Sequence, residues 1–425
     1  MALRILRSRV GGESVAPPSK SYTHRAFILA ALTGEKCEIV RPLISEDTSA
    51  TLSALGMMGA QIEKGTSVVS IECPVMHSPR KSIDARNSGT TLRLTSGIAA
   101  LLNGKTTITG DASLQKRPMK PLLTALRDLG AKCTGTDETE HPPVTIRGPM
   151  TEGFARLPGN ISSQFVSSLL LACPMKETST ELEITGTQKS KSYIDISLFM
   201  LEKFRIEVER RPEGFSIPGG QRPIGSRFSV PGDSSSAAFL LCAGAITGGT
   251  VTVKGLDPSM PQGDLAIIDA LRKYGADVEI RDDSVTCYPP DERKPFEFDV
   301  SDSPDLFPVL GVVAATAKGK SRLSGGEHLR FKESDRISTT VKMLKSLGVE
   351  AKALDDGCIV NGNGQIAGGA VDTQKDHRIM MAATIAGLVS VGGVMLEDEK
   401  SYEVSFPTFL DEVQRLGAIV QAVKQ

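Results

Sequence analysis

The sequence predicts an α/β fold built from six similar units of about 70 residues each. The first observation is a short phrase in which leucine is followed by glycine and then by alanine or valine. A degenerate copy, with Arg205 in the glycine position, fills the largest gap between the other copies. Glycine directly after an amphipathic segment is typical of a helix C-terminus. The phrase is centred on Gly59, Gly130, Gly275, Gly348 and Gly417.

A second set of segments recurs at the same interval and predicts six further helices. These segments are apolar on nearly all sides, so we expect the helices to be buried. They begin at Ser19, Ser88, Ser162, Ser234, Asp305 and Asp376. A short strand rich in β-branched or aliphatic residues follows each one, at 38–40, 107–109, 183–185, 251–253, 321–323 and 394–396. Each unit therefore contains a strand, a buried helix, a strand, an amphipathic helix and one or two more strands.

Six buried helices cannot share one small core, so the units are expected to group into two α/β domains. The repeat alone does not decide between two groups of three units and a ring of six units. The segment Phe228–Asp233 contains Pro-Gly and is the best candidate for a crossing between halves. Equivalent units would bring the starts of the buried helices together, and a cleft between the halves would then be lined by these helix starts and by the loops before the amphipathic helices.

Composition excludes several classes of protein. The chain has 425 residues, a net charge of −1, no tryptophan and 4% aromatic residues, which disfavours a nucleic-acid surface. Its seven cysteines are scattered and never form C-x-x-C, which indicates reduced thiols and no zinc site. No signal peptide or apolar run of membrane-spanning length is present. We therefore expect a soluble cytoplasmic protein.

Polar residues with the chemistry of an anion site coincide with the predicted helix starts of the first half. After Pro17-Pro18, the first helix carries Lys20, Ser21 and Arg25 in its first two turns. A helix N-terminus favours anions, and the added cations suit phosphate or carboxylate, although a solvated first turn is the alternative. Other polar or small residues occur at the corresponding places, namely Gly89, Arg117, Ser162, Ser163, Gln164 and Ser190.

The second half adds carboxylates to the cations. Lys332 and Arg336 are four residues apart and are expected to share a helix face. Asp305 is a helix cap in the simplest interpretation, and Glu333 with Arg336 an ordinary i,i+3 pair. Together with Arg378, however, these residues keep the register of the repeat. They predict a cleft for one or two small, multiply anionic substrates. No Walker loop is present, which disfavours an ATP-dependent kinase.

Collinear stretches over almost the whole chain resemble the 3-phosphoshikimate 1-carboxyvinyltransferase (EPSP synthase) family of enolpyruvyl transferases. The matching stretches are 18–25, 87–93, 116–118, 162–165, 192–195, 232–235, 262–264, 332–336 and 376–378. The resemblance implies an inside-out α/β barrel in each of two domains, with three βαβαββ repeats per domain. It implies an N-terminal lobe at 19–232 on the shikimate 3-phosphate side. A C-terminal lobe of 1–18 plus 233–425 would carry the catalytic carboxylates and the cations for phosphoenolpyruvate.

The implied reaction transfers the enolpyruvyl group of phosphoenolpyruvate to the 5-hydroxyl of shikimate 3-phosphate and releases phosphate, through a tetrahedral intermediate. No cofactor, metal, nucleic acid or membrane is implied, and the enzyme would be a monomer. Asp305 would be the base, Glu333 the acid, and Lys20 would lie between the ligands. The shikimate 3-phosphate residues would be Lys20, Ser21, Arg25, Ser162, Ser163, Gln164, Ser190, Asp305, His328 and Lys332. Those for phosphoenolpyruvate would be Lys20, Gly89, Arg117, Gln164, Arg336 and Arg378.

The chain departs from the family pattern at two positions. Val404 stands where the family often has a phosphoenolpyruvate-binding lysine, so Lys400 or another residue would replace it. His328 stands where asparagine is common. The nearest alternative is the UDP-N-acetylglucosamine enolpyruvyl transferase, but the loop at 110–117 lacks its cysteine and Lys20 is followed by Ser21. A non-catalytic binder of phosphate ligands or RNA ends on the same fold is the other alternative.

Overall fold

The computed structural model describes residues 2–397 and 400–423, so the terminal residues of the predicted domain ranges lie outside the described part. It separates into two compact units, Pro18–Val230 and Met1–Pro17 with Pro231–Gln425. We call these the N-terminal unit and the C-terminal unit. The chain passes between them at Pro17–Pro18 and at Val230–Pro231, where the prediction had 18–19 and 232–233.

The N-terminal unit contains three repeats with two helices each. The first comprises β14 (Arg227–Ser229), α1 (Lys20–Leu32), β3 (Cys37–Val40), α2 (Glu46–Met57), β4 (Gln61–Lys64) and β5 (Val68–Glu72). The second comprises β6 (Ile83–Asp84), α3 (Gly89–Ala99), β7 (Gly104–Thr109), α4 (Lys120–Asp128), β8 (Lys132–Thr134) and β9 (Val144–Gly148). The third comprises β10 (Phe154–Pro158), α5 (Ser163–Ala172), β11 (Thr180–Thr185), α6 (Lys191–Lys203), β12 (Glu209–Arg211) and β13 (Gly214–Ile217).

The C-terminal unit repeats this plan. Its first repeat comprises β2 (Gly12–Val15), α7 (Ser234–Thr247), β15 (Val251–Lys254), α8 (Ile267–Tyr274), β16 (Asp277–Arg281) and β17 (Ser284–Tyr288). The second comprises β18 (Glu297–Asp299), α9 (Phe307–Thr316), β19 (Lys318–Ser324), α10 (Arg336–Ser346), β20 (Glu350–Leu354) and β21 (Gly357–Asn363). The third comprises β22 (Gly369–Val371), α11 (His377–Gly387), β23 (Val394–Leu396), α12 (Phe409–Arg415), β24 (Ile419–Val423) and β1 (Ala2–Leu6).

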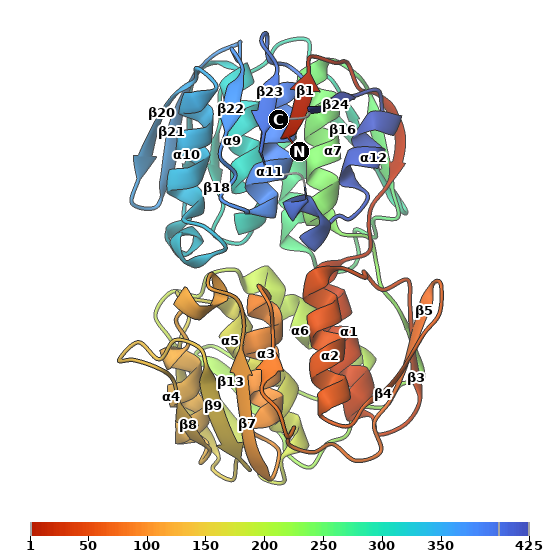
Figure 1. Cartoon of the computed structure of the whole chain (residues 1–425), viewed down its shortest axis with the longest axis vertical. Coiled ribbons are helices and arrows are strands. Elements are labelled where there is room, and N and C mark those ends of the chain that lie inside the picture. The colour runs from red at the N-terminus through yellow and green to blue at the C-terminus, as the bar shows by residue number, and fades with distance from the viewer. Residues whose placement is uncertain (1, 398–399, 424–425) are drawn as a thin grey trace. The chain divides into compact units, whose positions relative to one another are not determined.

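All six sheets have four strands in the same order. The first strand of a repeat runs parallel to the second, and the last strand lies between the second and the third, antiparallel to both. The N-terminal strand β1 takes the last position of the sixth sheet, between β23 and β24 (Figure 1). The predicted α/β class and six-repeat plan are confirmed.

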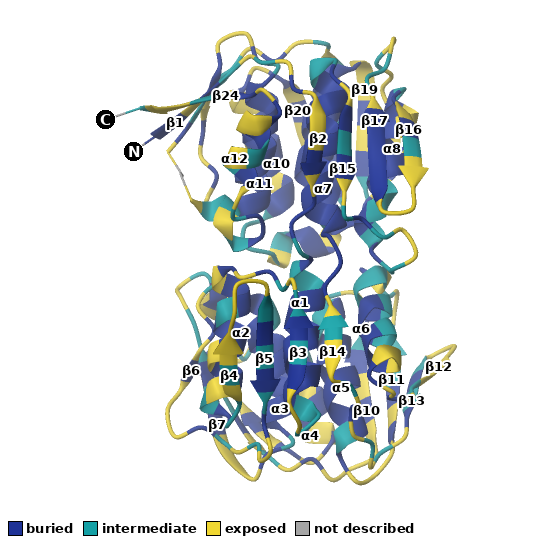
Figure 2. Ribbon diagram, turned by 90° about the vertical axis from the view of Figure 1, so that its right-hand side faces the viewer, coloured by how far each residue is buried: buried dark blue, intermediate teal, exposed yellow. Residues whose placement is uncertain are grey.

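The six apolar helices are buried, as their composition predicted (Figure 2). Side chains cap several of them: Ser88 accepts from the Thr91 N–H, and Asp233, one residue before the predicted start, accepts from Ser236 N–H. Ser19 occupies the cap position of α1, but its side chain makes no capping hydrogen bond. These caps fix where the chain enters each helix, and hence where the polar residues of the helix starts lie.

The recurring glycines end the amphipathic helices in the left-handed region that glycine adopts without strain. Gly59, Gly130, Gly275, Gly348 and Gly417 have φ between +80° and +114°. In the degenerate copy Arg205 has φ +63°, so the backbone keeps the same turn without glycine. Within the described residues, no helix is long and apolar enough to cross a membrane, and no group of three potential metal ligands is found.

Candidate active site

Arg336 is the centre of a charged cluster in the C-terminal unit. Its Nη1 donates to Asp305 Oδ1 at 2.6 Å, its Nη2 to Glu333 Oε2 at 2.6 Å, and its Nε to Asp376 Oδ2 at 2.9 Å. The Arg336 side chain is only 1% exposed. Burial alone would lower its pKa, but the carboxylates of Asp376, Glu333 and Asp305 raise the pKa well above its usual value. The arginine is therefore a permanent cation that holds three acidic groups.

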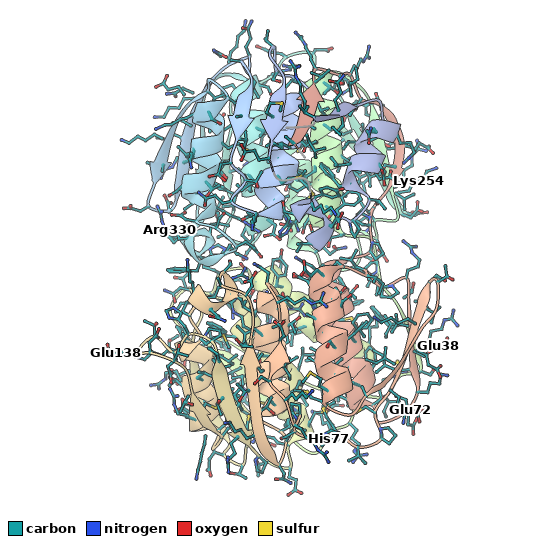
Figure 3. All side chains as sticks on the ribbon, viewed as in Figure 1. Glu38, Glu72, His77, Glu138, Lys254 and Arg330 are labelled. Carbon is teal, nitrogen blue, oxygen red and sulfur yellow. The ribbon has the colours of Figure 1, made fainter. Side chains whose placement is uncertain are left out.

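Local structure explains how Arg336 is positioned. It is the first residue of α10, and Asp335 caps that helix by accepting from the Ser338 N–H at 3.1 Å. Arg330, labelled in Figure 3, holds Asp335 through an ion pair of 2.8 Å. Lys332 precedes the helix in extended backbone, so the prediction that Lys332 and Arg336 share a helix face is wrong. Helix α10 begins at Arg336 because Asp335 caps its N-terminus.

Asp305 is not a helix cap. It lies in a 3-10 turn at Pro304–Leu306, and Leu306 occupies the cap position of α9. Its Oδ2 accepts from Arg378 Nη2 at 3.1 Å, while Oδ1 accepts from Arg336. Burial would raise the pKa of Asp305, but Arg378, Arg336 and Lys332 together hold the pKa well below its usual value. The carboxylate is therefore ionised at neutral pH and able to accept a proton or a hydrogen bond.

The pair of Glu333 and Arg336 is present, but it is not an ordinary surface pair. Exposed pairs of this protein include those of Lys254 with Glu13 and Glu38 with Arg227 (Figure 3), and such pairs contribute little. Glu333, by contrast, shares a fully buried guanidinium with Asp305, and its side chain is 21% exposed. Its partial exposure allows the Glu333 carboxyl group to reach a ligand.

Two acidic residues near this cluster were not predicted as site residues. Asp376 caps α11 through the Arg378 N–H at 2.9 Å and also accepts from Ser334 Oγ. Asp264 is fully buried and accepts from Ser235 Oγ. Burial and the charge of Asp305 raise the pKa of Asp264 to about 7. Asp264 and Asp376 lie in the matching stretches 262–264 and 376–378. The family resemblance was therefore the sequence signal that could have identified them.

In the N-terminal unit, Arg25 is buried among neutral oxygens. It donates to Ser197 Oγ at 2.8 Å, to Ser167 Oγ at 3.0 Å and to the carbonyls of Tyr193 and Ser21 at 3.0 Å each. Burial lowers its pKa to about 10, which leaves the guanidinium charged at neutral pH. These bonds connect α1 with α5 and α6. The predicted site residue therefore also joins three elements of its unit.

Gln164 lies in a second network of the N-terminal unit. Its Oε1 accepts from Arg93 Nη1 at 2.7 Å, and its Nε2 donates to Thr90 Oγ1 at 2.8 Å. Arg93 also lies over the Phe165 ring at 5.1 Å. Ser162 caps α5 by accepting from the Gln164 N–H at 3.3 Å. The starts of α3 and α5 are thus tied together, and Arg93, which was not named as a site residue, is the link.

Gly89 and Arg117 lie against each other. A Cβ atom at Gly89 would come within 2.7 Å of Arg117 Nη1, which explains glycine at the first position of α3. Arg117 is 5% exposed, and its Nη2 donates to Asn87 Oδ1 at 2.6 Å. Asn87 in turn donates to Asp111. The guanidinium is therefore aimed at the helix start by a chain of amide and carboxylate groups.

Lys20 pairs with Asp47, a residue that sequence reasoning missed. The Lys20 Nζ lies 3.1 Å from Asp47 Oδ2, and the two side chains are 14% and 8% exposed. Asp47 lies in the first turn of α2, which Ser45 and Thr48 close with a capping box. The only sequence signal for Asp47 was the general preference of acidic residues for the first turn of a helix.

The remaining predicted site residues fall in both units. Ser21 and Ser163 lie in the first turns of α1 and α5, and Ser190 precedes α6 with a left-handed φ of +53°. In the C-terminal unit, His328 is buried in the turn Glu327–Phe331, close in sequence to Lys332. Each unit thus contains its own share of the predicted residues, some at helix starts and others in the turns before them.

Comparison with known proteins points to one family. The family model described as EPSP synthase (3-phosphoshikimate 1-carboxyvinyltransferase) matches residues 6–413. Proteins named 3-phosphoshikimate 1-carboxyvinyltransferase from Methanocorpusculum labreanum and Methanocella arvoryzae are each 43% identical, over 98% and 99% of this chain and 99% and 100% of theirs. An EPSP synthase structure from Acinetobacter baumannii has a TM-score of 0.82 at 30% identity, covering 99% of this chain and 100% of the other.

The chain belongs to the EPSP synthase family. It is a transferase of the enolpyruvyl transferase type, in the shikimate pathway of aromatic amino-acid biosynthesis. The match runs through nearly the whole chain, so both units take part in the similarity. The predicted family and enzyme class are confirmed, and the alternative of a non-catalytic binder is wrong.

Proposed function

We propose that the chain transfers the enolpyruvyl group of phosphoenolpyruvate to the 5-hydroxyl of shikimate 3-phosphate and releases phosphate. The observation that supports this most directly is one buried guanidinium, Arg336, that holds both Asp305 and Glu333. A reaction that first adds a hydroxyl to a double bond and then eliminates phosphate needs a base, an acid and fixed cations. This cluster contains all three.

In the addition step, Asp305 accepts the proton of the 5-hydroxyl group. The oxygen of that hydroxyl group attacks C2 of phosphoenolpyruvate at the same time. Glu333 gives its proton to the methylene carbon C3, so that the tetrahedral intermediate carries a methyl group. In the elimination step, a carboxylate removes a proton from that methyl group, the double bond re-forms and phosphate leaves. Lys20, between the two ligands, and Arg378 stabilise the charge on the phosphate as the bond breaks.

Ligand binding should free the two carboxylates for this chemistry. Asp376 is fully buried and anchors one side of Arg336, whereas Asp305 and Glu333 are 16% and 21% exposed. An incoming phosphoenolpyruvate anion can therefore replace the two exposed carboxylates on the outer donors of Arg336, while Asp376 keeps the guanidinium oriented. Losing a cationic partner raises the pKa of a carboxyl group, which makes each one a better proton carrier.

We assign the remaining residues to the two ligands by their match to the motifs of the EPSP synthase family. Shikimate 3-phosphate is held by Lys20, Ser21, Arg25, Ser162, Ser163, Gln164, Ser190, Asp305, His328 and Lys332. Phosphoenolpyruvate is held by Lys20, Gly89, Arg117, Gln164, Arg336 and Arg378. Support comes from the buried cations and hydroxyl groups at the helix starts. The proposal includes a location in the cytoplasm, which the seven buried, unpaired cysteines support, and a monomeric state.

The experiment is phosphate release from phosphoenolpyruvate with shikimate 3-phosphate, run beside UDP-N-acetylglucosamine as acceptor. We expect release only with shikimate 3-phosphate. Asp305→Asn and Glu333→Gln should each lower kcat by about a hundredfold or more while phosphoenolpyruvate still binds. Release only with the sugar nucleotide would contradict the proposed acceptor. Full activity in either variant would remove that residue from its role.

A further inference from the structure

A cavity of about 440 Å³ opens in the C-terminal unit, far from the charged cluster around Arg336. It lies where α7, α9 and α11 end, and these three helices pack on one another. The same helices begin near Asp305 and Asp376. Because α9 has ten residues and rises about 1.5 Å per residue, the cavity is separated from the cluster by roughly 15 Å.

Three arginines line this cavity. Arg7 and Arg9 come from the segment between β1 and β2, and Arg293 from the segment before β18. No aspartate or glutamate is among the described residues that line it. Arg293 Nη2 donates to the Ile246 carbonyl at 2.7 Å, which orients that guanidinium at the end of α7. Arg7 and Arg9 are exposed, and within the described chain neither forms an ion pair.

The partial negative charges at the helix C-termini do not balance the positive charge of the three arginines. A helix C-terminus carries roughly −0.5 of an elementary charge, so three ends supply about −1.5 against three arginine charges. Two of the terminal carbonyls already have partners: Ile246 O accepts from Arg293, and Leu388 O accepts from the Ser8 N–H at 2.8 Å. A net positive charge therefore remains in the cavity.

Part of the cavity wall is apolar. Val391 is 69% exposed and Val389 is half-buried, so both valine side chains offer apolar surface to a ligand. Small-molecule sites are concave and carry a few convergent polar groups, and 440 Å³ lies within the usual range of volumes. Arginine recognises carboxylate and phosphate groups through paired N–H donors.

We propose that this cavity binds a small organic anion that is neither substrate of the reaction. Its carboxylate or phosphate group lies among Arg7, Arg9 and Arg293, and its apolar body contacts Val389 and Val391. The site is independent of the proposed reaction, because no residue assigned to either substrate lines it.

The test compares the wild type with Arg7→Ala/Arg9→Ala and with the control Arg4→Ala, an exposed arginine of β1 outside the cavity. Binding of phenyl phosphate, benzoate and inorganic phosphate is measured by calorimetry with shikimate 3-phosphate present in excess. The double variant should bind phenyl phosphate or benzoate about tenfold more weakly, while Arg4→Ala binds as the wild type does. The stronger of these two probes identifies the anionic group. Turnover in the double variant should be unchanged.

Equal binding by the wild type and the double variant would overturn the proposal. So would equal affinity for inorganic phosphate and phenyl phosphate at the arginine-dependent site, because Val389 and Val391 would then contribute nothing. Crystals soaked in 4-iodobenzoate give a direct second measurement through the anomalous signal of iodine. Iodine in the cavity supports the site, and iodine bound only elsewhere contradicts it.

Discussion

The two units share one repeat plan but hold their buried arginines in opposite ways. In the N-terminal unit, Arg25 donates to serine hydroxyls and backbone carbonyls, and burial lowers its pKa to about 10. In the C-terminal unit, Arg336 donates to three carboxylates, which raise its pKa well above the usual value. The surroundings of the two buried arginines therefore carry different charge balances.

The difference separates binding from proton transfer. Neutral partners fix the position of Arg25 without cancelling its charge, so the unit keeps a positive potential for phosphate and carboxylate groups. In the C-terminal unit, Arg336 and Arg378 pair with Asp305, Glu333 and Asp376, so groups that can carry protons lie beside fixed cations. The following experiments test this contrast, from the largest expected effect to the smallest.

Arg336→Met should have the largest effect, because it leaves three neighbouring carboxylates without their shared cation. We expect a loss of about 3–5 kcal/mol in the free energy of unfolding of the C-terminal unit and at least about a hundredfold loss of kcat/KM. Urea denaturation and phosphate release measure the two effects. Arg336→Lys should recover part of the stability, since one ammonium cannot donate to all three partners. A stability within about 1 kcal/mol of the wild type would contradict the shared-cation description.

Asp264 should make the C-terminal unit sensitive to pH. Its pKa is raised from 3.8 to about 7, so the folded state binds a proton that the unfolded state has released. Protonation of Asp264 adds on the order of 4 kcal/mol to the free energy of unfolding. This contribution is complete below pH 4 and is lost as the pH rises through 7. Asp264→Asn should flatten this dependence. Urea denaturation at pH 4, 5.5 and 7, followed by hydrogen exchange in α7 and α8, measures it.

Asp269→Asn is the matched control for this dependence, because Asp269 is an exposed carboxylate of α8. Its pH dependence of stability should equal that of the wild type. The assignment to Asp264 fails if Asp264→Asn leaves the slope of stability between pH 4 and 7 intact.

Arg25→Met should cost less stability than Arg336→Met, about 1–2 kcal/mol, because its partners are neutral. Ser197 Oγ and Ser167 Oγ already lie 2.8 Å apart and can remain bonded to each other. The KM for shikimate 3-phosphate should rise about tenfold or more, with little change in the KM for phosphoenolpyruvate. A loss of stability with both KM values unchanged would make Arg25 a packing residue and end its proposed binding role.

Gly89→Ala should have the smallest effect on stability and a selective effect on one substrate. The new Cβ would lie 2.7 Å from Arg117 Nη1, so the guanidinium must shift. We expect the KM for phosphoenolpyruvate to rise about tenfold, with a change in stability below about 1 kcal/mol. Gly56→Ala in helix α2 is the control, because the new Cβ would meet only the Ile62 side chain, at 3.7 Å. Equal KM values for phosphoenolpyruvate in Gly89→Ala and the wild type would contradict the contact with Arg117.

The sequence alone determined the repeat and the turns that end its helices. Glycine after each amphipathic helix and apolar residues along each buried helix depend on contacts within a few residues, so their pattern can be read directly. The positions of the polar residues at the helix starts followed from the same periodicity. Lys20, Gly89, Arg117, Asp305 and Arg336 were all identified in this way.

Only the tertiary structure decided which of these side chains meet. Asp305 and Arg378 are 73 residues apart in the chain, and Arg25 and Ser197 are 172 apart, yet both pairs are in hydrogen-bond contact. The pairing of Lys20 with Asp47, of Gln164 with Arg93 and of Ser235 with Asp264 could not be read from local sequence. Such contacts form because separate repeats pack their helices together. Burial then makes each charge depend on its neighbours, and neither effect is encoded in a short segment of sequence.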